Sequence, residues 1–249
     1  MKFDPTIIVF DELDSTSAEA GRRAQAGETG PLWLLARVQS AGRGRRGRVW
    51  QTGGDNLAAT LLLTLDASPL EAAQLGFVAA LAVGDMVQAY VPPAMVRLKW
   101  PNDVLIEGHK VAGILIESGP AQTGELWVSV GIGVNLASAP ANVDHPAIAV
   151  ADALSADVLR PPTQDEALEQ LSASFAGRLA QWLDQGFGPV RQAWLERAFG
   201  MGQPCRARLA RQTVEGVAES LDADGALLLR LPDGGLARIT AGDVFFGAT

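Results

Sequence analysis

The hydrophobic pattern of the chain changes at Gly200-Met201-Gly202, and this change limits the possible folds more than any other feature. Before it, apolar runs of strand length alternate with longer segments of helical periodicity. After it come only short strand-like runs that are separated by tight turns. The sequence therefore predicts an α+β unit over residues 1–200, with a mixed β-sheet backed by helices, and a small β-barrel-like unit over residues 201–249.

The apolar runs before residue 200 predict strands at residues 6–10, 32–38, 56–65, 96–100, 104–106, 110–117 and 126–136. Helical segments are expected at residues 18–25, 68–90, 148–156, 163–185 and 189–199. Capping boxes at Ser68 and Thr163 mark the starts of two of these helices, and Ser15 or Thr16 is a natural N-cap for the first. In the C-terminal β unit, strands are expected at residues 205–209, 213–221, 226–231 and 236–239.

Residues 39–50 form an unusual stretch, in which four arginines alternate with three glycines between Gln39 and Trp50. No Asp or Glu occurs in residues 29–54, although the chain has 28 of them and a net charge of −8. Glycine leaves the backbone N–H groups uncovered, and guanidinium forks pair well with phosphate oxygens. The arginine loop, residues 42–48, is thus typical of an anion site. Taken alone, it also fits a solvated loop or a nucleic-acid contact.

The composition excludes several classes of protein. A pI of about 4.8 disfavours non-specific binding to DNA or to anionic membranes, so the arginines should act on a small anion or a confined acidic partner. One cysteine, Cys205, excludes an internal disulfide and fits a reducing cytoplasm, and two histidines make no His-rich metal site. The N-terminus does not read as a signal peptide, and no run approaches the roughly 20 apolar residues that span a membrane.

Two further segments carry residues suited to chemistry. The chain has 17 arginines but only three lysines, and two of these, Lys99 and Lys110, lie in Lys99-Trp100-Pro101-Asn102-Asp103 and Lys110-Val111-Ala112-Gly113-Ile114-Leu115-Ile116-Glu117. A chain that prefers arginine so strongly is expected to keep lysine where a compact ammonium is needed. The third segment, Val130-Gly131-Ile132-Gly133-Val134-Asn135-Leu136, places two glycines in a predicted strand, which often marks the close approach of a ligand.

In order, spacing and glycines, these segments resemble the biotin–protein ligases, also called biotin–[acetyl-CoA-carboxylase] ligases, over essentially the whole chain. The resemblance implies a catalytic domain followed by an SH3-like β-barrel. It also implies a two-step reaction that uses ATP with Mg²⁺: biotin is activated as biotinyl-5′-AMP and is then transferred to a lysine of a biotin carboxyl carrier protein. We expect a loop that is disordered when empty and ordered when filled, since the arginine loop has no acidic neighbour in the sequence.

The resemblance also implies roles for individual residues. Lys110, Arg45 and Asp103 would be catalytic, with Asp103 orienting Lys110, deprotonating the incoming lysine, or merely stabilising a turn. Contacts to biotin would come from Ser15, Thr16, Ser17, Gln39, Gly42, Arg43, Gly44, Arg45, Lys110, Gly113, Ile114, Gly131 and Gly133. Contacts to ATP would come from Arg43, Arg45, Arg48, Trp50, Asn102, Lys110 and Asn135. No metal site built from protein ligands alone is expected.

Some points depart from the family or stay open. Ser17 stands where many members have Asn, and no N-terminal helix-turn-helix is visible, so the chain resembles the ligase-only kind without a DNA-binding domain. Arg46 has no matching role and is expected to be solvated. A lipoate or octanoate ligase that also makes an acyl adenylate is one alternative, and a nucleic-acid-binding regulator is another. The expected protein is cytoplasmic, a monomer or homodimer, and binds neither nucleic acid nor membrane.

Overall fold

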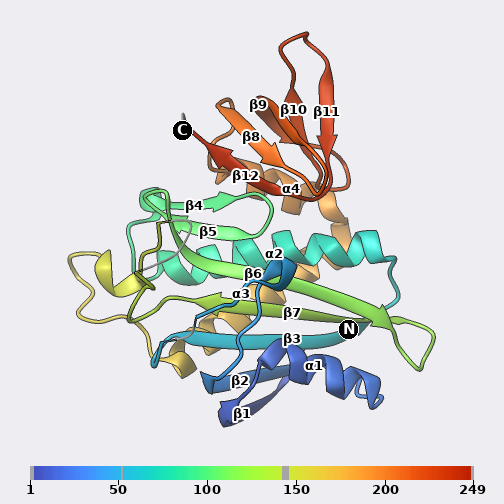
Figure 1. Ribbon diagram of the computed structural model, residues 1–249. Coiled ribbons are helices and arrows are strands. Elements are labelled where there is room, and N and C mark those ends of the chain that lie inside the picture. Colours follow the sequence, from blue (N-terminus) through green and yellow to red (C-terminus); the bar gives the residue numbers. More distant parts are fainter. Residues whose placement is uncertain (1–2, 52, 142–145, 248–249) are drawn as a thin grey trace.

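The computed structural model describes residues 3–51, 53–141 and 146–247, and it contains two β-sheets with helices around the larger one (Figure 1). The seven strands of the larger sheet follow the order β1 (Thr6–Leu13), β2 (Leu32–Gln39), β3 (Leu57–Leu65), β7 (Leu126–Val134), β6 (His109–Pro120), β5 (Asp103–Ile106) and β4 (Val96–Lys99). β1 and β2 run parallel, whereas the other neighbours are antiparallel. The mixed sheet predicted from the sequence is confirmed.

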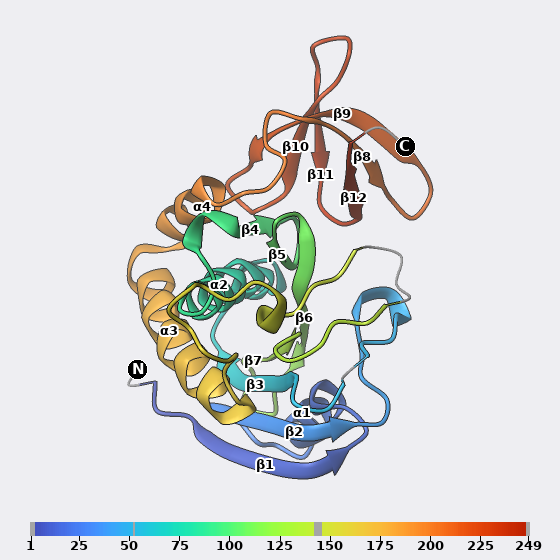
Figure 2. The ribbon, with the colours of Figure 1, turned by 90° about the vertical axis from the view of Figure 1, so that its left-hand side faces the viewer.

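Apolar side chains of β2 point in turn to the two faces of this sheet, and helices cover both faces. Trp33 and Leu35 belong to the main core, whereas Leu32 and Leu34 belong to a second, smaller cluster. Side chains of a strand point to opposite faces in turn, so β2 is buried on both sides. Helix α1 (Thr16–Gln25) covers the second cluster, while α2 (Pro69–Gln88) and α3 (Gln164–Gln185) cover the main core (Figure 2).

Helix α2 is the central helix of the main core. It starts at the predicted capping box, where Ser68 and Glu71 exchange side-chain to backbone hydrogen bonds. Within the described part of the chain, it is the one helix long and apolar enough to cross a membrane, with a mean hydropathy of 1.5. Most of this apolar stretch, 78%, is buried inside the protein, so its composition is that of a core helix.

The remaining helical segments were predicted less well. Helix α3 begins after the predicted cap at Thr163, but α4 (Phe187–Glu196) starts and ends before the expected 189–199. The helix expected at residues 148–156 is only a single 3-10 turn, η3 (Val150–Asp152). Two further 3-10 turns, η1 (Arg45–Gly47) and η2 (Pro93–Met95), were not predicted. Turns this short have no periodicity that a sequence pattern can reveal.

The C-terminal β unit is an antiparallel sheet in the order β11 (Leu236–Ile239), β10 (Leu227–Arg230), β9 (Thr213–Leu221), β8 (Pro204–Arg208) and β12 (Asp243–Phe246). It fits the small SH3-like β domain that was expected. Strand β12 was missed, because it pairs with β8, which is distant in sequence. The unit contacts the part of the chain that holds the larger sheet through Trp100, which follows β4: its Nε1 donates to the carbonyl of Gly225 at 3.0 Å. The boundary between residues 200 and 201 stays a prediction.

Candidate active site

A single row of residues crosses five strands of the larger sheet and forms the floor of the site. Reading from β3 to β4, the paired positions are Ala58, Gly133, Gly113, Asp103 and Lys99. Residues paired in this way share one face of a sheet. The first three have little or no side chain, so they leave a trough above the sheet, and the last two place opposite charges at its end.

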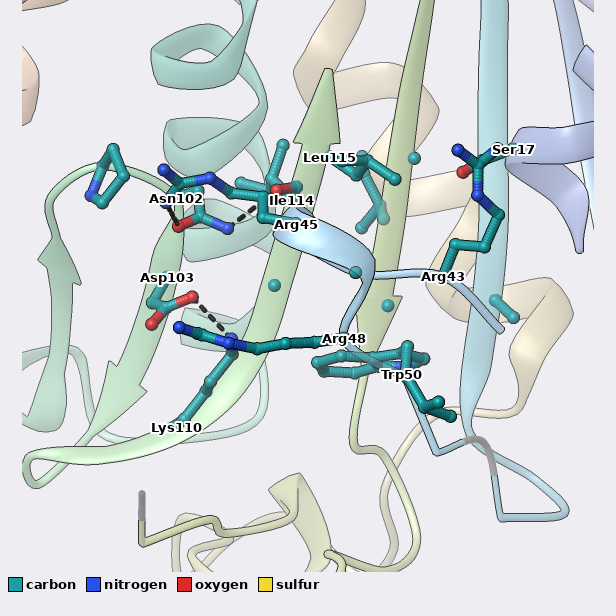
Figure 3. A pocket seen from close by; sticks show the side chains of 18 of the residues that line it. Ser17, Arg43, Arg45, Arg48, Trp50, Asn102, Asp103, Lys110, Ile114 and Leu115 are labelled. Carbon is teal, nitrogen blue, oxygen red and sulfur yellow. Dashed lines mark hydrogen bonds and ion pairs between the residues drawn. The ribbon is translucent and has the colours of Figure 1, made fainter. Parts of the chain in front are cut away.

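A cavity lies over this row (Figure 3). The residues that line it include every predicted site residue except Gly42 and Asn135. Residues from the arginine loop and from the C-terminal β unit also reach it. In Figure 3, Lys110 and Asp103 lie at one side of the cavity and Ser17 at the other, with the ring of Trp50 between them. The cavity therefore brings together segments that are far apart in the chain, from Ser15 near α1 to Val244 in the C-terminal β unit.

Hydroxyl and amide groups form one end of the cavity. Ser15 is the N-cap of α1, as predicted, and its hydroxyl accepts from the backbone N–H of Ala18. The Gln39 Oε1 atom accepts from both the backbone N–H and the hydroxyl of Thr16, at 2.8 and 3.1 Å. Thr60 donates to the Thr16 hydroxyl at 2.8 Å. These buried, mutually bonded groups offer a ligand fixed donors and acceptors at a helix N-terminus.

Glycines in the trough allow unusually close approaches. A Cβ atom at Gly131 would collide with the hydroxyl oxygen of Ser17, so only glycine lets α1 sit this close to β7. A Cβ atom at Gly133 would enter the indole of Trp50, and one at Gly113 would lie 3.1 Å from both Trp50 and the Lys110 ammonium. The ring of Trp50 occupies the slot over Gly113 and Gly133 in this structure, and the expectation that these glycines form a slot for a ligand stays a prediction.

Trp50 lies against the glycine floor. Its Nε1–H is buried and has no hydrogen-bond partner among the described residues, which typically costs about 1–3 kcal/mol. Its ring also faces the ammonium of Lys110, 5.5 Å from the ring centroid. Its carbonyl blocks any Cβ at Gly42, so Gly42 permits two loop strands to cross and does not line the cavity. The stacking of Trp50 on adenine stays a prediction.

A β-bulge aims Lys110 into the cavity. The pairing of β5 with β6 shifts between Val104 and Leu105, so that Leu105 pairs with Lys110 and Val111 is the extra residue. Strict alternation would place Val111 on the face of Gly113, and the bulge places Lys110 there instead. Its backbone is fixed by Asn135, whose buried amide donates to the carbonyl of Lys110 at 3.4 Å. Asn135 thus holds the backbone of Lys110 in place.

Charged groups gather at the opposite end of the cavity. The Lys110 ammonium forms an ion pair of 2.6 Å with Asp103. Asn102 is held by donating to the carbonyl of Ile114 at 2.8 Å, and its Oδ1 accepts from Arg45 at 2.8 Å. Burial lowers the pKa of Lys99, although Asp103 raises it. Two lysines and one arginine therefore converge on a site with few carboxylates.

Three arginines of the loop pair with carboxylates that are distant in sequence, although no acidic residue lies near the loop in the sequence. Arg43 pairs with Glu117 of β6 at 2.6 Å. Arg48 and Arg46 both pair with Asp243 of the C-terminal β unit, so Arg46 is not simply solvated. The sequence could not show this, because these partners lie far away along the chain.

Arg45 differs from the other three. Among the described residues it has no carboxylate partner within ion-pair distance, and it donates instead to Asn102 Oδ1 and to the carbonyl of Gly242. Burial lowers its pKa, while the charges of Asp243 and Asp103 raise it. Its positive charge is thus the least neutralised of the four, and it lies at the cavity.

Two family models match the sequence: the biotin/lipoate A/B protein ligase family over residues 9–135, and the biotin protein ligase C-terminal domain over residues 200–247. A biotin–[acetyl-CoA-carboxylase] ligase of Paracoccus denitrificans is 46% identical, over 94% of this chain and 98% of its own. The corresponding Mycobacterium tuberculosis ligase is 34% identical, over 95% and 87%. The chain belongs to the biotin protein ligase family.

Further relatives agree with this family. The bifunctional ligase/repressor BirA of Bacillus subtilis is 31% identical, over 97% of this chain and 74% of its own. A biotin protein ligase from Aquifex aeolicus, solved in complex with biotin and ATP, superimposes with a TM-score of 0.78 over 98% of this chain and 99% of that one. At 23% identity, this likeness establishes the ligase fold and no more.

Several residues at the ligase cavity were not predicted. They are Val49, Ala58, Lys99, Trp100, Pro101, Leu115, Ile132, Asp243 and Val244. Six of them, Val49, Lys99, Trp100, Pro101, Leu115 and Ile132, lie inside the segments that the sequence motifs span, so a wider reading of each motif would have found them. Asp243 and Val244 lie in the unpredicted strand β12, and no local signal marks them.

Proposed function

We propose that this protein is an ATP-dependent biotin ligase that makes biotinyl-5′-AMP and transfers the biotinyl group to a lysine of a biotin carboxyl carrier protein. One observation carries the proposal: a trough floored by glycines joins a hydroxyl and amide end to a cationic end within one cavity. Biotin has a polar ureido ring, an apolar chain and a carboxylate in this order. The named relatives support the same activity.

The hydroxyl and amide end suits the ureido ring. A ureido group carries one carbonyl acceptor and two N–H donors, and the network of Ser15, Thr16, Ser17 and Gln39 offers both kinds of partner. The chain of biotin would then lie along the trough over Gly131, Gly133 and Gly113, once the ring of Trp50, which lies against Gly133 and Gly113, has moved aside. Its carboxylate would end near Lys110, at the cationic end.

The first step joins two anions. A carboxylate oxygen of biotin attacks the α-phosphorus of ATP, the bond to the leaving pyrophosphate breaks, and the mixed anhydride forms. Lys110 and Arg45 would hold oxygens of the two anions together and follow the negative charge as it develops. Arg45 suits this role because its charge is not neutralised by a carboxylate among the described residues.

The second step requires a neutral lysine amine from the carrier. It attacks the carbonyl carbon of the anhydride, AMP leaves, and the amine loses a proton. Asp103 is the carboxylate nearest to Lys110, at 2.6 Å, and its role would be to hold this ammonium in place. A free acyl adenylate reacts with water, so the arginine loop and Trp50 would exclude water until the carrier arrives.

Magnesium would arrive with the nucleotide. The two carboxylates that line the cavity, Asp103 and Asp243, are both engaged with cationic side chains. Neither is therefore free to anchor a metal, and Mg²⁺ would be held mainly by phosphate oxygens and water. Arg43, Arg48 and Asn102 remain proposed nucleotide contacts, and each arginine has further N–H donors for a phosphate while it stays paired with Glu117 or Asp243.

The decisive experiment compares ATP–pyrophosphate exchange with biotin, lipoate and octanoate as acyl substrates. Exchange with biotin alone is expected, followed by labelling of a purified carrier domain. Equal or faster exchange with lipoate or octanoate would instead indicate a lipoate or octanoate ligase. Reaction in the cytoplasm is part of the proposal, because both ATP and carboxylase carriers would be supplied there.

A further inference from the structure

One carboxylate in the cavity comes from the C-terminal β unit. Asp243, at the start of β12, is only 9% exposed and accepts hydrogen bonds from Arg48 and, at 3.2 Å, from Arg46. The carbonyl of the preceding Gly242 accepts from Arg45 at 3.2 Å. Two adjacent residues of this unit therefore hold three arginines of the arginine loop.

A carboxylate that lines the cavity is not expected to bind the nucleotide directly. An anion beside the site for a triphosphate would repel it, unless arginines neutralise that anion. Burial raises the pKa of Asp243, but the hydrogen bond from Arg48 and the charges of Arg48, Arg46 and Arg45 outweigh this, so its pKa lies below the ordinary value. Arg208 of β8 adds a further positive charge at 3.6 Å. Asp243 is therefore ionised and fully paired.

The pairing has a consequence for Arg45. If Arg46 and Arg48 were not engaged by Asp243, four guanidinium groups on one short loop would repel one another. Asp243 and Glu117 offset two of the four positive charges on the loop, and Arg45 is the one loop arginine that has no carboxylate at ion-pair distance among the described residues. The loop is thus fixed in position through three of its arginines, and Arg45 faces the cavity without a carboxylate partner of its own.

We propose that Asp243 is a positioning residue for the formation of the adenylate, because it fixes the arginine loop over the cavity and directs Arg45 toward the reacting phosphate. The attachment of the loop follows from the contacts alone. Its effect on the adenylate rests on the proposed function. The C-terminal β unit then completes the active site and is not an appendage of the catalytic sheet.

The attachment can be tested without any substrate. The variants are Asp243→Asn, which keeps the shape but removes the charge, Asp243→Glu, which keeps the charge, and Glu219→Gln. Glu219 pairs with Arg230 in the same β unit but lies outside the cavity lining, so its variant is a matched loss of one carboxylate. None of the three adds or removes an arginine, so trypsin meets the same cleavage sites.

In ligand-free protein, Asp243→Asn is expected to speed tryptic cleavage within the arginine loop about tenfold or more, since breaking a buried ion pair lowers the cost of local opening. Asp243→Glu and Glu219→Gln should be cleaved at the wild-type rate. Equal rates for Asp243→Asn and wild type would overturn the attachment. Cleavage throughout the chain of Asp243→Asn, rather than within the loop, would also overturn it, since it would show a role in folding only.

The effect on chemistry needs a second measurement. Asp243→Asn should lower kcat for biotin-dependent pyrophosphate exchange about tenfold, as for one weakened electrostatic contact, and leave the KM for biotin unchanged. A raised KM for biotin with normal kcat would overturn the positioning role. Absence of biotin-dependent exchange in the wild type would instead refute the proposed function, while the cleavage result would still decide the attachment.

Discussion

The ammonium of Lys110 lies 2.6 Å from the carboxylate of Asp103, across the neighbouring strands β6 and β5. Only the bulge at Val111 gives this contact, because regular pairing would turn Lys110 toward the other face of the sheet. A lysine held in this way is oriented before any substrate enters. It loses little freedom when a substrate carboxylate binds beside it.

Replacing this lysine tests the cationic end of the cavity. We expect Lys110→Ala to fold but to lose about 10²–10³ in the rate of pyrophosphate exchange or more, since one electrostatic donor at the reacting anions is removed. The side chain is 26% exposed, so its loss should barely change the unfolding midpoint, which thermal denaturation checks. Near-normal exchange by this variant would refute the assignment of Lys110.

The two possible roles of Asp103 affect different steps of the reaction, so they can be distinguished. If Asp103 orients Lys110, Asp103→Asn should slow adenylate formation, because the partner of the ammonium loses its charge. If it instead deprotonates the carrier lysine, adenylate formation should stay normal and only transfer should slow. We expect the first result, measured as single-turnover formation of biotinyl-5′-AMP against transfer from preformed adenylate.

Removal of Arg45 should release the intermediate. A guanidinium fork holds a phosphate and excludes water together, so Arg45→Ala is expected to make adenylate that escapes from the site. The measurement is biotin labelling of bystander albumin in the presence of biotin and ATP. Arg37→Ala is the matched control, because Arg37 pairs with Asp165 away from the cavity. Leakage by the control but not by Arg45→Ala would show that the loop is assigned wrongly.

The glycine floor gives a steric prediction. A methyl group at Gly131 would collide with the hydroxyl of Ser17, so Gly131→Ala should raise the Kd for biotin about tenfold or more, as expected when a binding contact worth about 1.4 kcal/mol is displaced. At Gly21, inside α1, an added methyl group would meet no atom within 4 Å, so Gly21→Ala is the control and should bind biotin normally. Isothermal titration with biotin measures both variants.

The pKa of Asp243 predicts how its contribution depends on pH. An aspartate in the unfolded chain titrates near about 3.9, and that of Asp243 in the folded protein lies lower. Its stabilisation is therefore present above about pH 4 and is lost as the pH falls through the lower, folded value. The cationic side chains that face it are Arg45, Arg46, Arg48, Arg208 and Lys99.

The test is denaturant unfolding of wild type and Asp243→Asn from neutral to acidic pH. The difference in their free energies of unfolding should shrink as the solution becomes more acidic. A difference that stays constant throughout would show that the charge of Asp243 does not matter to stability.

Much of the catalytic sheet could be predicted from its sequence, since each strand carries its own pattern. In β3, Ala59, Leu61 and Leu63 belong to the main core and Leu62 to the smaller cluster, and the capping boxes at Ser68 and Thr163 fix two helix starts. Most candidate site residues could be predicted as well, because Lys110, Gly113 and Gly133 lie within short motifs. Local signals of this kind survive in the fold wherever tertiary contacts agree with them.

Contacts between distant segments could not be predicted. Nothing near Arg48 in the sequence shows that Asp243 will neutralise it, and nothing near Val111 marks a bulge. The hydrogen bond from Asn135 to the carbonyl of Lys110 was likewise not predicted. From the resemblance, Asn135 was expected to contact the nucleotide instead. Each of these depends on strand register or on domain contact, which a single sequence does not show.

Because Asp243 lies in β12, the order of synthesis on the ribosome decides when the arginine loop can be attached. Every strand of the catalytic sheet leaves the exit tunnel before β12 does, and domains fold as units during translation. A nascent chain can thus hold the trough and Lys110 while its arginines still lack their carboxylate partner. The cavity is completed only when β12 pairs with β8, so attachment of the arginine loop follows the folding of the larger sheet.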